Sequence, residues 1–503
     1  MFMKIMEETI AMEGINFLFL LLLLVLVLVL LCFIYKYITS PTLPPGPFSW
    51  PIIGNILAIG KRPHVSLAQL AQAHGPLFSL RLGAQLVVVG SSPAAAHEIL
   101  KVHDRLLSAR SIPNAAPAKN PAYTYCSVGW ADCTDQWKYL RNICGSELFS
   151  TKAIESQSKL REDKVIELVE FLGTKEGQVV NIGEVVFATA FNMLSNILVS
   201  KDFINLEGER GGEGMKGIVR TYVEVGITPN IADFYPILGV FDLQGLKRKS
   251  MESFVKICGF WEGIIKERRE SKDGDVSMRQ RDFLDYLLSI GFNNDQINHL
   301  LLELFLAGVD TTTPTIEWAM AELIKNQKTM KNVRDELERE INKNCVNESD
   351  LVRLPYLHSC IKETLRLHHP GPLSIPRRAL ETCKVMNYTI PKGSQVFVNL
   401  WAIGRDPMTW NDPLVFKPER FLDASVESNS SGFGWIPFGA GRRSCPGQPM
   451  ANKQVPLIIA SLIKRFDWSL PHDMNPSELN MDETFGLTLQ REQPLILIPK
   501  VKK

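Results

Sequence analysis

The chain has 503 residues, of which 45% are hydrophobic and 22% are charged, a composition that excludes a wholly disordered protein. Its 55 basic and 54 acidic residues leave a net charge of +1, so nucleic acid is not an expected partner: the basic excess that phosphate binding requires is missing. The nine cysteines form no C-x-x-C pair, which argues against a disulfide scaffold or a zinc ribbon and favours a reducing compartment.

An apolar run lies near the N-terminus. Residues 17–34 read FLFLLLLLVLVLVLLCFI, and with their flanks they reach the roughly 20 residues that a membrane-spanning helix needs. Acidic residues precede the run and no small-residue cleavage site follows it, which argues against a cleaved signal peptide. Because Lys36 and further basic residues follow the run, the positive-inside tendency places the rest of the chain in the cytosol. We expect a lumenal N-terminus over 1–14 and a transmembrane anchor over 15–35.

Closely spaced prolines follow the anchor. Residues 41–47 read PTLPPGP, and because proline fixes φ we expect a stiff, extended tether over 36–54. A Gly-rich patch over 208–214 is interpreted as a loop, and no second linker is visible. A single domain is therefore expected over 55–503.

That domain shows mainly helical periodicity. Apolar residues recur at helical spacing over 294–325, with Asn294 and Asp295 as the expected N-cap, which predicts one helix long enough to cross the domain. A second helix is predicted over 355–367, before Pro370. Short β-rich pieces are predicted at 78–82, 86–89, 385–390 and 395–398. The expected fold class is mainly α with small β-sheets, an α+β protein.

The sharpest signal lies at 438–447, which read FGAGRRSCPG. Three glycines permit a tight loop with unusual backbone angles and let a flat group approach the backbone. A cysteine held in such a loop beside arginines suits a thiolate metal ligand. The run matches F-x-x-G-x-R-x-C-x-G at every fixed position, and in this it resembles the cytochrome P-450 family of haem-thiolate monooxygenases.

The resemblance implies the fold of that family, with haem b bound between the long helix and the cysteine loop. It implies that Cys445 is the axial iron ligand, that Arg443 pairs with a haem propionate, and that Phe438 and Gly447 contribute to the haem site. Thiolate donation favours cleavage of the O–O bond of O2. By the same resemblance, electrons from NADPH are expected to arrive through a separate protein, NADPH-cytochrome P-450 reductase.

Residues 307–312 read AGVDTT and resemble the family's oxygen-binding motif. By that resemblance Ala307 leaves room for O2, and Asp310 and Thr311 form the catalytic pair that guides protons to it. The alternative is a structural Gly and Thr bend in a buried helix. Pro314 lacks the amide that would bond to the carbonyl of Asp310, which predicts a stronger local kink.

Two further motifs carry the resemblance. Glu363 and Arg366 match E-x-x-R, whose spacing places both on one helix face, and by resemblance Arg420 completes a buried structural network with them. An isolated pair of this kind would be a solvated salt bridge.

Trp137 and Arg141 match W-x-x-x-R, and Pro376-Arg377 follows the E-x-x-R helix at the place typical of the family. These three side chains are therefore expected to donate to the haem propionates. An amphipathic helix face and an ordinary surface arginine are the alternatives, and Arg378 lies beside Arg377 as a second candidate.

The strings WAIGRDP at 401–407, NIADFYP at 230–236 and FGLTLQ at 485–490 resemble the plant microsomal branch and, within it, the subfamily of geraniol hydroxylases and diterpene oxidases. That resemblance favours hydroxylation or epoxidation of a terpenoid, with an alkaloid or a phenolic as the alternative. From the family's pocket-lining segments we expect a mostly apolar substrate pocket formed by Leu304, Ala307, Leu373, Ser374, Ile375, Phe485 and Leu487.

The expected location is the endoplasmic reticulum membrane, with a cytosolic catalytic domain in contact with lipid. Two alternatives remain open. A haem-thiolate isomerase or dehydratase would need no reductase, although such relatives generally lack the threonine at the position of Thr311. A membrane scaffold for other biosynthetic enzymes would carry out no turnover of its own.

Overall fold

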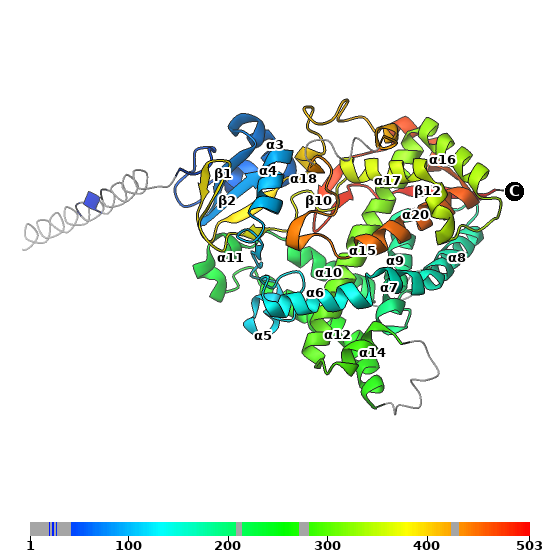
Figure 1. Cartoon of the computed structure of the whole chain (residues 1–503), viewed down its shortest axis with the longest axis horizontal. Coiled ribbons are helices and arrows are strands. Elements are labelled where there is room, and N and C mark those ends of the chain that lie inside the picture. The colour runs from blue at the N-terminus through cyan, green and yellow to red at the C-terminus, as the bar shows by residue number, and fades with distance from the viewer. Residues whose placement is uncertain are drawn as a thin grey trace, which may run out of the picture.

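The computed structural model describes residues 42–207, 214–270, 281–423 and 432–502, together with Leu20, Leu23, Leu24 and Val27. It confirms the expected mainly helical fold with small sheets. Strands β1 (Leu77–Leu82) and β2 (Gln85–Gly90) lie at one end of the body, helices make up most of the remainder, and the C-terminus lies at the opposite end (Figure 1).

The longer helices are α3 (Pro63–His74), α6 (Asp135–Glu147), α8 (Ser158–Thr174), α9 (Ile182–Val199), α10 (Met215–Ile227), α12 (Leu246–Glu270), α15 (Asn294–Lys325), α16 (Gln327–Glu340), α17 (Pro355–Leu367) and α20 (Gln448–Arg465). The shorter helices are α2 (Ile56–Ile59), α4 (Pro93–His97), α5 (Pro121–Thr124), α7 (Thr151–Ser156), α11 (Ile231–Phe234), α14 (Phe283–Ser289) and α18 (Leu400–Ile403).

The long helix predicted over 294–325 is confirmed as α15, with 32 residues. The predicted N-cap, Asn294 or Asp295, is wrong by one or two positions, because Asn293 is the N-cap of the helix. The Asn293 side chain accepts from the Gln296 amide at 2.9 Å, and the Gln296 side chain accepts from the Asn293 amide at 3.0 Å, which forms a capping box. The helix continues through Pro314, so the proline does not end it.

The main sheet has the order β1-β2-β8-β5-β3, in which β2 and β8 are parallel and the other pairs are antiparallel. Its remaining strands are β8 (Gln395–Val398), β5 (Arg377–Arg378) and β3 (Ala109–Arg110). A second sheet joins β4 (Val180–Asn181), β12 (Ile496–Val501) and β9 (Phe466–Ser469). Two hairpins complete the strands: β6 (Cys383–Val385) with β7 (Tyr388–Ile390), and β10 (Glu483–Phe485) with β11 (Leu489–Arg491).

The strands predicted at 78–82, 86–89 and 395–398 correspond to β1, β2 and β8. The single piece predicted at 385–390 is wrong, because the chain reverses there to form the β6–β7 hairpin. Met386 and Asn387 have φ of 48° and 69°, the left-handed conformation that a two-residue hairpin turn requires.

One described helix, α9, is long and apolar enough to cross a membrane, but 78% of its apolar window is buried inside the molecule. It packs along α15 as a core helix, with buried side chains such as Phe191 and Leu194. The anchor expected over 15–35 lies outside the described residues except for four helical positions with exposed side chains: Leu20, Leu23, Leu24 and Val27.

The described part of the expected tether lies against the body. The Ser79 amide donates to the carbonyl of Pro45 at 2.8 Å, and the Ser79 hydroxyl donates to the carbonyl of Pro44 at 2.7 Å. Gly46 permits this approach, since a Cβ there would lie 1.8 Å from the Ser79 carbonyl oxygen. The segment that enters the body is thus held on β1 by backbone contact.

Replacing Gly46 with alanine should therefore push this segment away from β1 and lower the free energy of unfolding by about 1–3 kcal/mol. The matched control is Gly259→Ala within α12, where a Cβ meets nothing within 4 Å and should not destabilise the helix. Thermal unfolding followed by circular dichroism measures both variants. A midpoint for Gly46→Ala equal to that of the control would contradict the packing argument.

Candidate functional site

The cysteine loop has the tight geometry that its glycines predict. The Cys445 amide donates to the carbonyl of Phe438 at 2.8 Å, which closes the loop. Gly439 and Gly441 have φ of 67° and 70°. A Cβ on Gly441 would also lie 2.2 Å from the carbonyl oxygen of Leu100, so this position has both a conformational and a steric need for glycine.

The surroundings of the Cys445 thiol act on its pKa in opposing directions. Burial raises the pKa of this thiol, and the amides of Gly447 and Gln448 and the charge of Arg141, which favour the thiolate, offset part of that rise. Helix α20 begins at Gln448, so its positive N-terminal end lies beside the sulfur. Cys445 keeps an exposed surface, which leaves the sulfur open to a ligand.

Helix α15 leaves a strip of its surface open at the predicted oxygen motif. Ala307 and Thr311, one turn apart, are exposed although Phe305, Val309 and Thr312 around them are buried. The Thr311 hydroxyl donates to the carbonyl of Ala307 at 2.7 Å. An open strip in the middle of a buried helix is what a bound planar group with O2 beneath the helix would require.

Asp310 adjoins this strip and is bonded to a distant segment. The hydroxyl of Thr488, between β10 and β11, donates to its carboxylate at 3.0 Å. Burial raises the pKa of Asp310 to about 6, and the Thr488 bond lowers it against that trend. A carboxyl with this pKa exchanges protons near neutrality, as proton transfer requires.

Four arginines gather near the cysteine loop, and the sequence analysis missed one of them. Arg110 and Arg377 stand opposite each other on β3 and β5. Burial, followed by the charges of Arg443, Arg377 and Arg141, lowers the pKa of Arg110 well below its usual range. Nothing in the local sequence marked Arg110, because only strand pairing brings it to the cluster.

The neighbouring residues Arg377 and Arg378 differ in how deeply their side chains are buried. Arg377 is 3% exposed and donates to Asp104 at 3.4 Å and to the carbonyl of Ala440 at 3.3 Å. The half-exposed Arg378 pairs with Asp132 at 2.9 Å instead. The structure therefore places Arg377 in the arginine cluster and Arg378 outside it.

Trp137 and Arg443 meet at one backbone carbonyl. The Trp137 indole donates to Val128 O at 2.9 Å, Arg443 donates to the same oxygen at 3.3 Å, and the guanidinium lies 4.6 Å from the indole ring centroid. Arg141, also on α6, donates to the carbonyl of Ser444 in the cysteine loop. The W-x-x-x-R helix is thus joined to the cysteine loop, while its donation to a propionate stays a prediction.

Glu303 is a further buried carboxylate that the sequence analysis missed. It accepts from the amides of Val128 and Gly129 at 2.8 and 3.0 Å and from the hydroxyl of Ser127. Burial raises the pKa of its carboxyl. A lone charge four residues before Ala307 in an otherwise apolar run was the signal that could have revealed it.

These features fit the haem that the sequence resemblance implies. Among the described residues, the ion pairs of the arginine cluster supply one carboxylate, that of Asp104, which pairs with Arg377. The remaining positive charge suits two further carboxylates such as the propionates of haem. Cys445 would supply the thiolate ligand of the iron, and Ala307 and Thr311, which are exposed in the middle of α15, would leave room for O2.

The residues expected to line the substrate pocket differ in exposure. Ile375 and Leu487 are each 46% exposed, and Leu304 is half-buried. Leu373 is instead nearly buried in an apolar cluster against which Phe485 packs, which leaves little of it for a ligand. The Ser374 hydroxyl is buried and has no hydrogen-bond partner among the residues that the structure describes. Gly486, which lies between Phe485 and Leu487, is close to α10, because a Cβ at this position would lie 3.6 Å from the Ile227 side chain.

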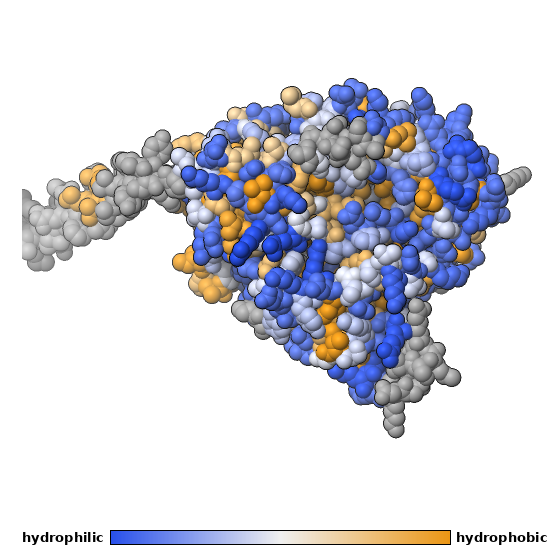
Figure 2. Space-filling view, viewed as in Figure 1, coloured by the Kyte–Doolittle hydropathy of each residue, from blue (hydrophilic) through white to orange (hydrophobic). Residues whose placement is uncertain are grey.

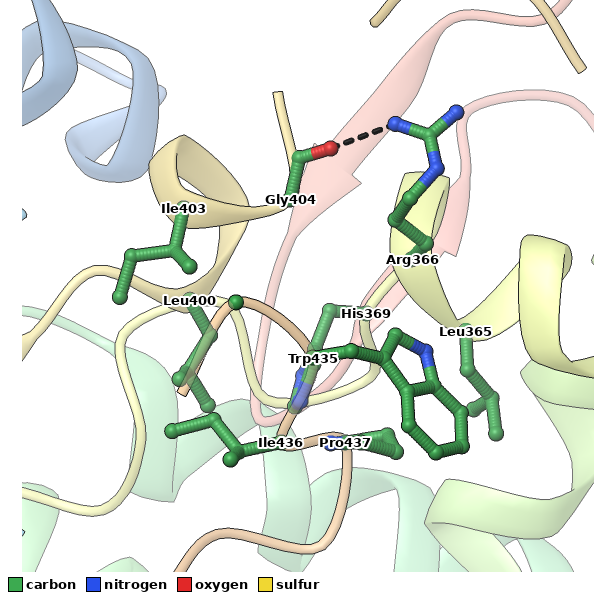
Figure 3. A pocket seen from close by; sticks show the side chains of 10 residues that line it. Leu365, Arg366, His369, Leu400, Ile403, Gly404, Trp435, Ile436 and Pro437 are labelled. Carbon is green, nitrogen blue, oxygen red and sulfur yellow. Dashed lines mark hydrogen bonds between the residues drawn. The ribbon is translucent and has the colours of Figure 1, made fainter. Parts of the chain in front are cut away.

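The expected three-residue network is present. Arg366 donates to both carboxylate oxygens of Glu363 at 2.7 and 2.8 Å, and Arg420 donates to Glu363 at 3.1 Å. The side chains of Glu363 and Arg366 are 0% exposed. Arg366 also donates to the carbonyl of Gly404 at 2.5 Å (Figure 3), which ties α17 to the end of α18.

A small pocket beside this network is shown in Figure 3. Its lining residues are Leu365, Arg366, His369, Leu400, Ile403, Gly404, Gly434, Trp435, Ile436 and Pro437. None of the residues expected to contact substrate is among them, so this pocket is not the expected substrate site. His369, the second histidine of an adjacent pair, accepts from the Gly371 amide at 3.0 Å, and burial lowers its pKa to about 4.

Comparison with known proteins agrees with this geometry. A family model described as cytochrome P-450 matches residues 44–498. The chain is 50% identical to a probable (S)-N-methylcoclaurine 3'-hydroxylase isozyme 2 of Coptis japonica, over 93% of this chain and 96% of that protein. It is 47% identical to (S)-N-methylcoclaurine 3'-hydroxylase isozyme 1 of Eschscholzia californica, over 91% and 94%. A geranylhydroquinone 3''-hydroxylase of Arnebia euchroma is 43% identical, over 93% and 96%.

Replacing Glu363 with alanine leaves Arg366 and Arg420 without their buried counter-charge, and we expect the free energy of unfolding to fall by about 3–5 kcal/mol. The matched control is Asp135→Ala, which removes another i,i+3 partner, that of Lys138, from a pair open to water. Urea denaturation should show a lower midpoint for the first variant and an unchanged one for the control. Equal midpoints would contradict a structural role for the network.

Proposed function

This chain belongs to the cytochrome P-450 family, and from that premise we propose that it hydroxylates an alkaloid of the N-methylcoclaurine type. As a member of the family it is a monooxygenase that uses haem b, O2 and electrons from NADPH delivered by a reductase. Haem held by a cysteine thiolate supplies the activation of O2 and the insertion of one of its oxygen atoms into the substrate.

The proposed haem site uses residues from four parts of the chain. Cys445 would bind the iron, with the amides of Gly447 and Gln448 stabilising its thiolate. Phe438 and Gly447 belong to the loop that would lie against the ring. The donors proposed for the propionates are Trp137, Arg141, Arg377 and Arg443, and the geometry adds Arg110 to that set.

For the oxygen motif on α15, the proposed roles follow from the exposed strip formed by Ala307 and Thr311. Ala307 would leave room for O2 beside the helix. Thr311 Oγ1 and the carboxyl of Asp310 would pass protons toward it, because the hydroxyl is exposed and the acid titrates near neutrality.

The observation that carries the substrate proposal is the 47–50% identity to N-methylcoclaurine hydroxylases over more than nine-tenths of this chain. The terpenoid class expected from the sequence is not confirmed by these relatives. It stays as a second candidate, supported by the resemblance of the FGLTLQ string at 485–490 and by the geranylhydroquinone 3''-hydroxylase. In either case, exposed Ile375 and Leu487 would offer apolar contact to the substrate.

An exposed apolar surface supports the proposed location at the endoplasmic reticulum membrane. Figure 2 shows hydrophobic side chains at the edge of the molecule where α11 lies in Figure 1. Ile237 and Val240, just after α11, are 83% and 85% exposed, and Ile52 near the N-terminal end of the body is 80% exposed. Tyr235 donates to the carbonyl of Ile52 at 3.2 Å, so the two segments are neighbours. We propose that this surface meets lipid beside the anchor expected over 15–35.

Replacing Cys445 with serine should abolish the thiolate-type spectrum of the carbon monoxide complex, because an alcohol is a poor substitute for the thiolate ligand. The control is Cys345→Ser, which removes an exposed cysteine on another part of the surface and should preserve the spectrum. The reduced difference spectrum of the purified variants provides the measurement. A retained spectrum in Cys445→Ser would disprove the ligand assignment.

The substrate proposal is tested in microsomes that contain this protein and the reductase, with NADPH and either (S)-N-methylcoclaurine, geraniol or a diterpene. Turnover is normalised to haem that binds carbon monoxide, and Cys445→Ser microsomes serve as the blank. We expect an NADPH-dependent hydroxylated product from (S)-N-methylcoclaurine. Product from geraniol or the diterpene alone would favour the terpenoid candidate. Intact haem without any product would reject both substrate classes and favour the scaffold alternative.

A further inference from the structure

The bond between Asp310 and Thr488 joins two segments 178 positions apart in the chain. Thr488 is 4% exposed and lies in the turn between β10 and β11, while Asp310 lies in the middle of α15. The donor and acceptor oxygens are 3.0 Å apart. An exposed hydroxyl can bond to water, but a buried hydroxyl such as that of Thr488 needs a hydrogen-bond partner within the protein.

The backbone on either side of Thr488 is fixed independently of Asp310. The Leu489 amide donates to the carbonyl of Pro370 at 2.9 Å, and the Trp318 indole donates to the carbonyl of Leu489 at 3.2 Å. Phe485 pairs with Leu489 in the hairpin register. The Thr488 hydroxyl is therefore presented to α15 from a turn whose two ends are held by hydrogen bonds and strand pairing.

Charged groups on α15, on the β10–β11 hairpin and on α9, which packs against α15, are engaged elsewhere. Their pairs are Glu317 with Leu495 N (2.8 Å), Arg491 with Asn480 O (2.7 Å), Glu483 with His64 (2.7 Å) and Glu184 with Arg220 (3.3 Å). Two causes act on the pKa of Asp310: burial raises it, and the Thr488 hydroxyl, which donates to the charged form, lowers it. Thr488 thus holds the carboxylate in place and favours its ionised form.

We propose that Thr488 is a positioning residue for proton delivery: its hydroxyl fixes the Asp310 carboxyl beside Thr311, so that the acid remains oriented for transfer. The proposal rests on the monooxygenase function and the relay role proposed above. The turn that carries Thr488 also carries Leu487, and Phe485 ends β10 directly before it; both residues are expected to touch substrate. The geometry therefore connects the acid to the wall of the substrate site through one short turn.

The test compares Thr488→Val, which keeps the shape and removes the hydroxyl, with Thr488→Ser, which keeps the hydroxyl. Thr484→Val is the matched control, since Thr484 is exposed on β10 of the same hairpin. The first readout is the infrared titration of the carboxyl group in the holoenzyme without substrate, with Asp310→Asn used to assign the band. Loss of the bond should raise the midpoint by about one pH unit in Thr488→Val. Thr488→Ser and Thr484→Val should keep the wild-type midpoint.

The second readout is coupling, the fraction of oxidised NADPH recovered as product rather than as peroxide, with (S)-N-methylcoclaurine as the probe. Thr488→Val should lose coupling several-fold and shift its pH profile upward, and Thr488→Ser should restore both. All values refer to haem that binds carbon monoxide, and Thr488→Ala replaces the valine variant if that one does not bind haem.

An unchanged infrared midpoint and unchanged coupling in Thr488→Val would overturn the proposal. If Thr311→Ala loses coupling while Thr488→Val does not, the positioning role fails and the relay stands. If the wild-type protein gives no product from the probe, the substrate proposal fails, and the infrared titration still decides the role of Thr488.

Discussion

Helix α15 carries carboxylates and hydroxyls through the middle of an apolar body. A carboxylate or hydroxyl buried there without a partner is costly. Five of these groups are bonded to segments outside the helix: Glu303 to 127–129, Asp310 to Thr488, Thr312 to Gln454, Glu317 to Leu495 and Glu322 to His368. The helix thereby orders loops that are remote in the chain around the site it carries.

The cysteine loop depends on the same kind of long-range pairing. Arg443 donates to the carbonyls of Ser108 and Val128, so the loop is joined to the segment that Glu303 holds from the other side. Arg377, from the central sheet, reaches the carbonyl of Ala440 within the loop. The loop, the sheet and α15 are therefore parts of one polar framework, whose excess of buried positive charge fits an anionic cofactor.

This framework explains how related hydroxylases can act on different substrates. Arg141, Arg377 and Asp310, which contact the cysteine loop or belong to the oxygen motif, lie in helices and sheet strands, while Ile375 and Leu487 lie in connections between such elements. Binding residues on connections can vary without loss of the scaffold. Thr488 is an exception, because it belongs to such a connection and yet bonds to the acid of the oxygen motif.

The sequence alone determined the features that depend on local interactions. Helical periodicity predicted α15 and α17, glycine placement predicted the tight cysteine loop, and i,i+3 spacing predicted the contact of Glu363 with Arg366, because each depends on residues a few positions apart. Only the tertiary structure revealed Arg110 in the arginine cluster, Glu303 at the 127–129 loop and Thr488 at Asp310, and only it separated Arg377 from Arg378. Those partners are more than 100 residues apart or lie on paired strands, and their meeting is decided by packing of the whole core, which no local pattern encodes.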